Sequence, residues 1–568
     1  MRLAAAIVVT ALVMSGQGVA SAAAAPVRPD PLLSWSEHPG HVDAATLART
    51  RAAKSRERIL ATTTPGRVHA EREPASARGR NDAVASAEVT GFSSSPGAVI
   101  TGSLLADPTL AVLPEFAEPN DSAAAASDTG VGTPARRAMR TTGRITGADQ
   151  DFYRLRGSGH TRIATLTPGS DLDTVLTVFD AAGQEVAASD NVGATFDASL
   201  EADLTAGAEY LVRVTGGPGG PSGTYELTID TGEGLGDKDF YSVRLKAGDV
   251  LGASVTGSAR KLVVHDTAGR EVQGSRQDFS VVYPPSSPLP GGGNAVVDFV
   301  APSAGRYYLG VEDGEGRYDL TLKALRPGAE AAGLQTVFVD FDGALVDTTP
   351  YGGEGVKSLS PMANFLAAWG LGPADEAAVS TAAVDALREN LGLSGRFGVR
   401  ILNSRDHADP WGRKNVSRLV IGGTIAESGV STVAIAQSID PGNFAHEETA
   451  LVQLDLLSAP AGPSVSLNTY LTPASDKTRF IGRALGNIAA HELGHLSGSW
   501  HQHQFNEHDT LMDQGGNAPA MFAVGADGIG GNADDVDIDF GEDVFVPNEG
   551  FTGVEDAANR TRWGYSRG

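Results

Sequence analysis

Short runs of alternating apolar and polar residues, bounded by Gly, Asp or Pro, dominate the chain between residues 113 and 325. Such alternation is typical of β-strands with one buried face. The runs also repeat with a period of about ninety residues, since "DQDFY" at 149–153 returns as "DKDFY" at 237–241. The pattern therefore predicts two successive antiparallel β-sandwiches of about eight strands each, at residues 113–231 and 232–325.

The pattern changes near residue 331, where helical periodicity occurs beside short apolar runs. "TVFVDFDG" at 336–343 predicts a strand, and the segment 375–392 predicts a helix with Val379, Ala383 and Leu387 on one face. Similar short runs predict strands at 398–402, 418–423, 432–439 and 450–457. We expect a multidomain protein, in which two all-β domains of the sandwich or jelly-roll type precede an α+β domain at 331–568.

The N-terminal 25 residues have the pattern of a secretory signal peptide: Arg2, an apolar run that ends at Met14, and small residues before Pro26. The apolar run is about twelve residues long and spanning a membrane needs about twenty, so integral membrane association is not expected. Residues 26–112 are rich in Ala, Arg, Ser and Pro and predict a largely irregular propeptide or linker. The sequence leaves open which of the two it is.

Composition narrows the class of protein. The 568 residues include no cysteine, so stability cannot depend on disulfides. The formal net charge of −25 argues against a nucleic-acid partner, because phosphate binding requires clustered Lys and Arg. Together with the signal peptide, these features predict a secreted, extracellular protein that acts as a monomer.

One segment concentrates a scarce residue type. "HELGHLSGSWHQH" at 491–503 holds four of the twelve histidines of the chain. It overlaps a predicted helix at 479–498, which begins after Ser475 or Asp476 and ends near a glycine. Histidines four residues apart lie on one helix face with Cβ atoms about 5 to 6 Å apart. The spacing therefore predicts a metal site.

The ligands and the chemistry follow from the same segment. His491 and His495 share the helix face, Gly498 allows a sharp turn through positive φ, and His501 then completes the site. Three imidazoles leave a fourth position for water, which is typical of catalytic zinc. Zinc lowers the pKa of that water to about 7, and Glu492 would be the general base. His503 and His508 remain alternatives for the third ligand, although spacing favours His501.

The sequence from "HELGHLSGSWH" to "TLMD" at 510–513 resembles the metzincin clan of zinc metalloproteases, and its matrixin-type members most closely. The resemblance covers roughly residues 331–568 and is specific only at 491–512. It implies that Met512 lies in a tight turn beneath the metal. It also implies an endopeptidase that hydrolyses internal peptide bonds of protein or peptide substrates through a zinc-bound water.

The predicted β-domains carry a second resemblance. "EPNDS" at 118–122, the Asp-x-Asp-Phe-Tyr segment and a closing Gly-Thr-Tyr-x-Leu are similar to the bacterial pre-peptidase C-terminal domain, and the second copy lacks the "EPND" opening. The resemblance implies a structural calcium site, whose ligands here would be Glu118, Asn120, Asp121, Asp149 and Asp151. The acidic, Gly-rich segment 527–543 leaves open a further calcium loop, for which the oxygen ligands would be Asp527, Asn532, Asp534 and Asp535.

Two other functions remain as alternatives. One is a catalytically inactive secreted adhesion or binding protein that uses the β-domains. The other is a phosphatase of the haloacid-dehalogenase type, since "DFDG" resembles its first motif with Asp340 as nucleophile and Asp342 as general acid. Ala344 stands where that motif has Thr, and the long alternation of strands and helices of a doubly wound sheet is not evident. The sequence does not indicate the natural substrate.

Overall fold

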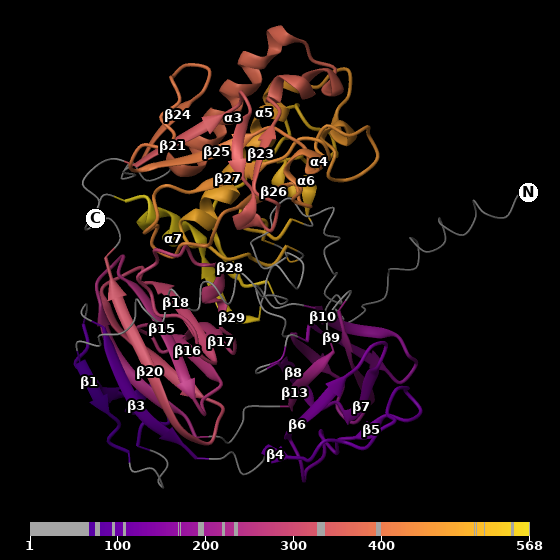
Figure 1. The fold of residues 1–568 in the computed structure, drawn as a ribbon, viewed down its shortest axis with the longest axis vertical. Helices are drawn as coiled ribbons and strands as arrows, with labels where there is room; N and C mark the ends of the chain where they lie inside the picture. The colour runs from indigo at the N-terminus through magenta and orange to yellow at the C-terminus, as the bar shows by residue number, and fades with distance from the viewer. Residues whose placement is uncertain are drawn as a thin grey trace, which may run out of the picture.

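The structure is a computed structural model, in which β-sheet predominates and several β-domains are present (Figure 1). It describes residues 67–73, 80–93, 97–105, 110–167, 170, 172–190, 198–217, 222–231, 237–326, 335–392, 399–504, 506, 508–515, 517–546 and 550–566. The predicted signal peptide and residues 26–66 of the predicted propeptide or linker lie outside the described residues. No helix in the described part of the chain is long and apolar enough to cross a membrane.

The first sandwich contains strands β4 to β13. One five-stranded sheet has the order β10-β9-β12-β7-β5 and the other has the order β11-β8-β13-β6-β4. Inward-facing residues such as Ile163, Val212 and Leu227 are fully buried between the sheets. The strands are β4 (Leu110–Val112), β5 (Ser127–Asp128), β6 (Ala138–Ile145), β7 (Gln150–Arg156), β8 (Gly159–Leu166), β9 (Thr174–Asp180), β10 (Glu185–Asp190), β11 (Ser199–Leu204), β12 (Glu209–Gly216) and β13 (Gly223–Asp230).

The second sandwich is assembled from three separate parts of the chain. Its sheets have the orders β1-β3-β20-β15-β18 and β2-β14-β19-β16-β17-β29-β28. The 3-10 helices η2 (Val84–Ser86) and η3 (Phe279–Val282) accompany them. The strands are β1 (Arg67–Ala70), β2 (Glu88–Val89), β3 (Ala98–Leu104), β14 (Asp239–Leu245), β15 (Val250–Gly257), β16 (Lys261–His265), β17 (Glu271–Ser275), β18 (Ala295–Val300), β19 (Gly305–Glu312), β20 (Gly316–Leu325), β28 (Glu542–Val544) and β29 (Phe551–Asp556).

The first sandwich is inserted into the second, between β3 and β14. Strand β3 pairs antiparallel with β20, as β6 pairs with β13 in the first sandwich. Gly102 in β3 lies under the ring of Tyr318, and Gly143 in β6 lies under Tyr225 in the same way. The strands β1 to β3 are therefore the opening of the second copy. In Figure 1 the indigo strands β1 and β3 lie beside the much later β20.

This arrangement differs from the predicted boundaries. Residues 26–112 were expected to be largely irregular, yet β1, β2 and β3 lie there, and the second copy begins well before residue 232. The alternation of buried apolar and exposed polar residues is weak in this segment because β1 and β2 are short, and because Val68 and Val89 are exposed at 67% and 52%. A repeat sought in contiguous sequence also misses a domain that another domain interrupts.

The C-terminal region contains a mixed sheet with the order β24-β21-β25-β27-β26, in which only the β26–β27 pairing is antiparallel. A hairpin of β22 and β23 lies beside it. The strands are β21 (Gln335–Asp340), β22 (Ala344–Asp347), β23 (Val356–Leu359), β24 (Val399–Asn403), β25 (Val416–Ile421), β26 (Ala434–Ala436) and β27 (Thr449–Val452). The helices are η4 (Thr349–Tyr351), η5 (Met362–Trp369), η6 (Pro373–Asp375), α3 (Glu376–Gly392), α4 (Ile425–Ser428), η7 (Leu467–Tyr470), α5 (Lys477–Leu496), α6 (Ala518–Met521) and α7 (Ala557–Gly564).

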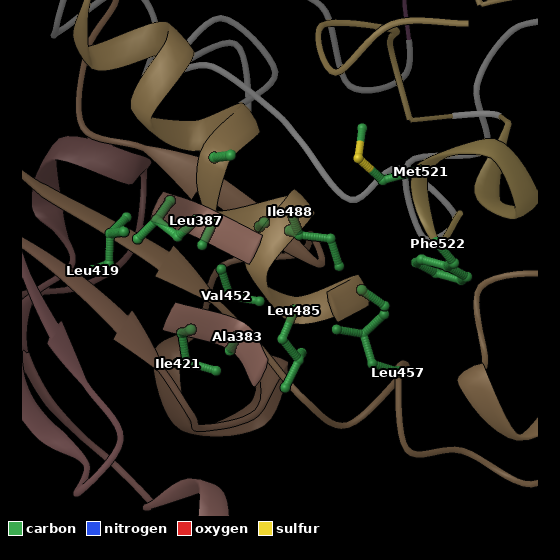
Figure 2. Packing of buried hydrophobic residues seen from close by; sticks show 14 of the residues in the cluster. Ala383, Leu387, Leu419, Ile421, Val452, Leu457, Leu485, Ile488, Met521 and Phe522 are labelled. Carbon is green, nitrogen blue, oxygen red and sulfur yellow. The ribbon is translucent and has the colours of Figure 1, made fainter. Parts of the chain in front are cut away.

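Helices α3 and α5 pack closely and bury the core of this region. Figure 2 shows Leu387 of α3 and Leu485 of α5 in one cluster with Leu419 and Val452 of the sheet. The close approach requires glycine, because a Cβ at Gly486 would lie 2.5 Å from the carbonyl oxygen of α3 residue Ala383. The predicted helices 375–392 and 479–498 are confirmed as α3 and α5, with small shifts at their ends.

Candidate metal centre

Helix α5 carries the first two histidines of the motif. The Asp476 carboxylate accepts a hydrogen bond from the backbone N–H of Arg479 at 3.2 Å, which caps the helix N-terminus. His491 and His495 lie one turn apart near the other end, and their ring centroids are 4.8 Å apart. The predicted helical spacing therefore places both rings on one face.

The chain turns sharply at Gly498. This glycine has φ of +98°, and a Cβ there would lie 2.2 Å from the Cα of Pro441. Positive φ and the close backbone approach both require glycine. The turn brings His501 back to the helix, where its ring centroid lies 5.4 Å from that of His491 and 4.7 Å from that of His495.

The three imidazoles converge on one point. One ring nitrogen from each of His491, His495 and His501 lies within 4.8 Å of the other two, and all three side chains are fully buried. The Nε2 atoms of His495 and His501 are 3.2 Å apart. Two nitrogen ligands about 2.0 to 2.1 Å from a tetrahedral zinc ion lie about 3.3 Å from each other. The donor set and its spacing thus fit zinc.

Backbone carbonyls orient two of these rings. Nδ1 of His495 is 2.8 Å from the carbonyl oxygen of Ser499, and Nδ1 of His491 contacts the carbonyl oxygen of Leu511. A carbonyl oxygen only accepts hydrogen bonds, so each Nδ1 carries the proton and donates it. In a neutral imidazole this leaves Nε2 as the atom that can bind a metal, which is a common arrangement around metal-binding histidines.

Glu492 and Met512 lie within the same buried region. Glu492 follows His491 on α5 and is fully buried, as is Met512. Met512 packs on the helix backbone between the two histidines, because a Cβ at Gly494 would lie 2.4 Å from the Met512 sulfur. The Met512 carbonyl oxygen accepts a hydrogen bond from the N–H of Gln502 at 2.7 Å, which ties this turn to the residue after His501.

The two alternative candidates for the third ligand, His503 and His508, take no part in this convergence. The N–H of His503 donates to the carbonyl oxygen of Val544 at 3.1 Å, and His508 is exposed. Neither belongs to the groups of converging ligand side chains in the described residues. The structure therefore places His501 in the third position that spacing favoured.

Asp340 and Asp342 form a local turn at the end of β21. The Asp340 carboxylate accepts a hydrogen bond from the N–H of Asp342 at 3.1 Å, while the Asp342 side chain is exposed. Burial raises the pKa of Asp340 to about 6. Within the described residues these two carboxylates are not part of a converging ligand group.

The calcium ligands expected in the first sandwich are partly brought together. Carboxylate oxygens of Glu118, Asp149 and Asp151 lie within 4.8 Å of one another. Burial is the main cause that raises the pKa of Asp151 to about 7, and Glu118 adds to it. Asn120 is buried, and its backbone carbonyl oxygen accepts a hydrogen bond from the N–H of Phe152 at 3.0 Å.

Asp121, the remaining residue of that set, is exposed, and its pKa is raised through desolvation and the neighbouring Asp149. It therefore lies at the rim of the cluster.

The acidic segment after Met512 forms a hydrogen-bonded loop. Asp534 accepts from the N–H of Asp527 at 3.2 Å, and Asn532 donates to Asp527 at 2.8 Å. Asp535 forms an ion pair with Arg479 at 3.0 Å. These oxygens already have partners within the chain, and the converging ligand groups of the described residues do not include this loop.

A further acidic cluster was not predicted from the sequence. Glu73, Asp82 and Asp237 lie together in the second sandwich. The carbonyl oxygen of Asn81 accepts from the N–H of Phe240 at 2.9 Å, as that of Asn120 does from Phe152 in the first sandwich. The dipeptide Asn-Asp at 81–82, shared with 120–121, was the available signal.

Comparisons with known proteins add little. No protein-family model and no curated protein matches the chain. Among solved structures, the chain is similar to the pre-peptidase C-terminal domain of a collagenase from Bacillus anthracis at 19% identity, covering 20% of this chain and all of that one, with a TM-score of 0.15. It is also similar to a periplasmic inhibitor of g-type lysozyme from Aeromonas hydrophila at 17% identity, covering 22% of this chain and 96% of the inhibitor, with a TM-score of 0.14.

Proposed function

We propose that this protein is a secreted zinc-dependent endopeptidase of the metzincin type. The observation that supports the proposal is the convergence of His491, His495 and His501, in which the Nε2 atoms of His495 and His501 are 3.2 Å apart, close to the separation of two ligands of one zinc ion. The signal peptide pattern at residues 1–25 supports export. Protein or peptide chains would be the substrates.

The roles of the residues follow from their chemistry. When bound, zinc would polarise the scissile carbonyl and lower the pKa of water at its open position. Glu492 would accept a proton from the attacking water as the new C–O bond forms, and would then donate that proton to the amine nitrogen as the peptide C–N bond breaks. The three histidines hold the metal, and Met512 supports their helix from below through its contact at Gly494.

A structural calcium site in the first sandwich belongs to the same proposal. Glu118, Asp149 and Asp151 offer three carboxylates at one place, and calcium takes six to eight oxygen ligands, including backbone carbonyls and water. Calcium would relieve the mutual repulsion of these carboxylates, which is among the causes of the raised pKa of Asp151.

The test separates metal binding from proton transfer. Zinc content and casein cleavage would be measured for the wild-type protein and for Glu492→Gln, which keeps the volume of the buried side chain. We expect near-stoichiometric zinc in both and cleavage only in the wild type. Absence of zinc from both proteins would overturn the proposal. Zinc in both without cleavage in either, across a broad set of protein substrates, would favour an inactive adhesion or binding protein.

A matched pair of histidine variants tests the third ligand. His501→Ala should lose zinc, because two imidazoles remain, whereas His503→Ala should keep it. The reverse result would move the site to the other histidine. Phosphate-ester hydrolysis that depends on Asp340 and survives zinc removal would instead favour the phosphatase-type alternative.

A further inference from the structure

A buried ionic network joins the second sandwich to the loop that carries His501. Asp298 lies on β18 of the second sandwich and is fully buried. The indole N–H of Trp500, the residue immediately before His501, lies 3.2 Å from both oxygens of the Asp298 carboxylate. A β-domain residue thus contacts the neighbour of the proposed third ligand directly.

Arg560 of α7 links the same carboxylate to the start of the loop. Its Nη1 donates to Asp298 Oδ1 at 2.6 Å and to the carbonyl oxygen of Gly498 at 3.1 Å, and its Nη2 donates to the Asp298 carbonyl oxygen at 2.8 Å. Its Nε pairs with Glu555 at 2.8 Å. Glu555 in turn accepts from the backbone N–H of Trp500 at 3.3 Å. Both ends of the loop are therefore held.

Asp298 is itself fixed within the second sandwich. The hydroxyl of Tyr283 donates to its carboxylate at 2.5 Å, and its backbone N–H donates to the Gln273 side chain at 3.0 Å. Trp500 also packs in an aromatic cluster with Phe279 of this sandwich and Phe551 of β29, at ring centroid distances of 5.6 and 4.6 Å. The loop is thus held both by hydrogen bonds to Asp298 and by packing of Trp500 in the aromatic cluster.

The hydrogen bonds to Asp298 do more than fill space. Apolar residues of similar volume often stabilise a fold as well as a buried ion pair does, so such a pair is weak evidence for a role in stability. The hydrogen bonds to Asp298 and Arg560 instead fix the position of the backbone at Gly498 and Trp500. His501 follows directly, and its ring must lie within a few tenths of an ångström of one point to bind a metal.

We propose that Asp298 is a positioning residue for the zinc site, and that the second sandwich is consequently part of the catalytic unit. Asp298 acts through Trp500 and Arg560, which together set the path of residues 498–501. This inference rests on the proposed function, because it concerns the same metal. It assigns to the second sandwich a role distinct from substrate binding or simple extension of the chain.

The test uses two variants of the full-length protein. Asp298→Asn removes the charge and keeps the side-chain size, and Trp500→Phe removes the N–H donor and keeps an aromatic ring in the cluster. We expect zinc affinity, measured by chelator competition, to fall about 10- to 100-fold in Asp298→Asn, as is typical for groups that orient metal ligands. Trp500→Phe should also lower the zinc affinity. The visible spectrum of the Co²⁺-substituted variants should differ from that of the wild type.

Glu312→Gln is the matched control. Glu312 forms a buried ion pair with Lys261 at 3.1 Å in the same sandwich and lies on β19, between β14 and β16. The Glu312→Gln variant should be less stable than the wild type, with an unchanged zinc affinity and an unchanged Co²⁺ spectrum. If Asp298→Asn does not fold, Trp500→Phe decides the question.

Unchanged zinc affinity and an unchanged spectrum in both loop-contacting variants would overturn the inference and leave the proposed function standing. A wild-type protein that neither binds zinc nor cleaves protein would instead remove the proposed function itself.

Discussion

The hydroxyl of Thr552 donates a hydrogen bond to the carboxylate of Glu271, 281 residues earlier in the chain. The two residues lie on β29 and β17, which pair antiparallel with Gln273 opposite Gly553. The end of the chain thus completes a sheet of the second sandwich. The C-terminal region and this sandwich therefore share one hydrogen-bonded sheet.

The shared sheet predicts that the C-terminal region does not work alone. A chain of residues 335–568 would leave β29 without its partner strand β17, Arg560 without Asp298, and Trp500 without its aromatic neighbour Phe279. Arg560 would keep its ion pair with Glu555 but would lose its hydrogen bonds to the carboxylate and the backbone carbonyl oxygen of Asp298. We expect this fragment to be readily proteolysed and to retain no zinc.

Deletion of the first sandwich is the control for that experiment. The N–H of Leu105 lies 2.7 Å from the Asp237 carboxylate, so the two ends of the insertion are close together. A chain in which a short Gly-Ser linker replaces residues 106–236 should remain folded and keep zinc. A stable, zinc-binding fragment 335–568 would contradict the structure.

Gly498 should tolerate no side chain. A residue with a Cβ at positive φ costs about 1 to 2 kcal/mol, and at Gly498 the Cβ would also collide with the Pro441 backbone. Gly498→Ala should therefore displace His501 and weaken zinc retention in a chelator assay by at least about tenfold. Gly429→Ala is the matched control, because Gly429 has φ of +72° with no atom within 4 Å of the added Cβ. Equal zinc retention in both variants would show that the turn does not set the ligand position.

The sequence was sufficient where a local spacing determines geometry. His491 and His495 lie together because four residues make about one helical turn, and Gly498 could be recognised because only glycine readily adopts its backbone conformation. The strands of the first sandwich could likewise be predicted from alternation, since each strand is half buried in contiguous sequence.

The sequence was insufficient where residues distant in the chain meet. Asp298 reads as one of many acidic residues, and only the fold places it against Trp500. Strands β1 to β3 are separated from β14 by the whole first sandwich, so the second copy appeared to lack its opening. Neither relationship leaves a local pattern of apolar residues, because each joins segments of the chain that only the tertiary fold brings together.

Met512 should stabilise the site through its volume and not through its sulfur chemistry. It is fully buried against the α5 backbone at Gly494. Truncation of a buried Met to Ala costs about 2 to 5 kcal/mol, whereas the volume-conserving change to Leu costs less than about 1.5 kcal/mol. We expect Met512→Ala to lower the free energy of unfolding and to weaken zinc retention, and Met512→Leu to retain most of both. Urea unfolding and chelator competition would measure these effects, and equal losses in the two variants would contradict this account.

A buried carboxyl in the second sandwich should make stability depend on pH. Asp239 is fully buried, and burial is the main cause that raises its pKa to about 9 from 3.8, while the hydroxyl of Tyr318 donates to it at 2.7 Å. Its folded pKa lies above the unfolded one, so the folded state holds a proton that the unfolded state releases. The stabilisation is complete below pH 4 and is lost as the pH rises from about 4 to about 9.

Asp239→Asn removes this titration and keeps the size of the side chain. The free energy of unfolding of the variant, minus that of the wild type, should therefore increase steadily between pH 5 and pH 9 because only the wild type loses stability through this group. Urea unfolding of both proteins at three pH values within that range would measure the difference, with contributions from other groups cancelling. A difference that stays constant over the range, or that decreases, would show that Asp239 does not hold its proton in the folded protein.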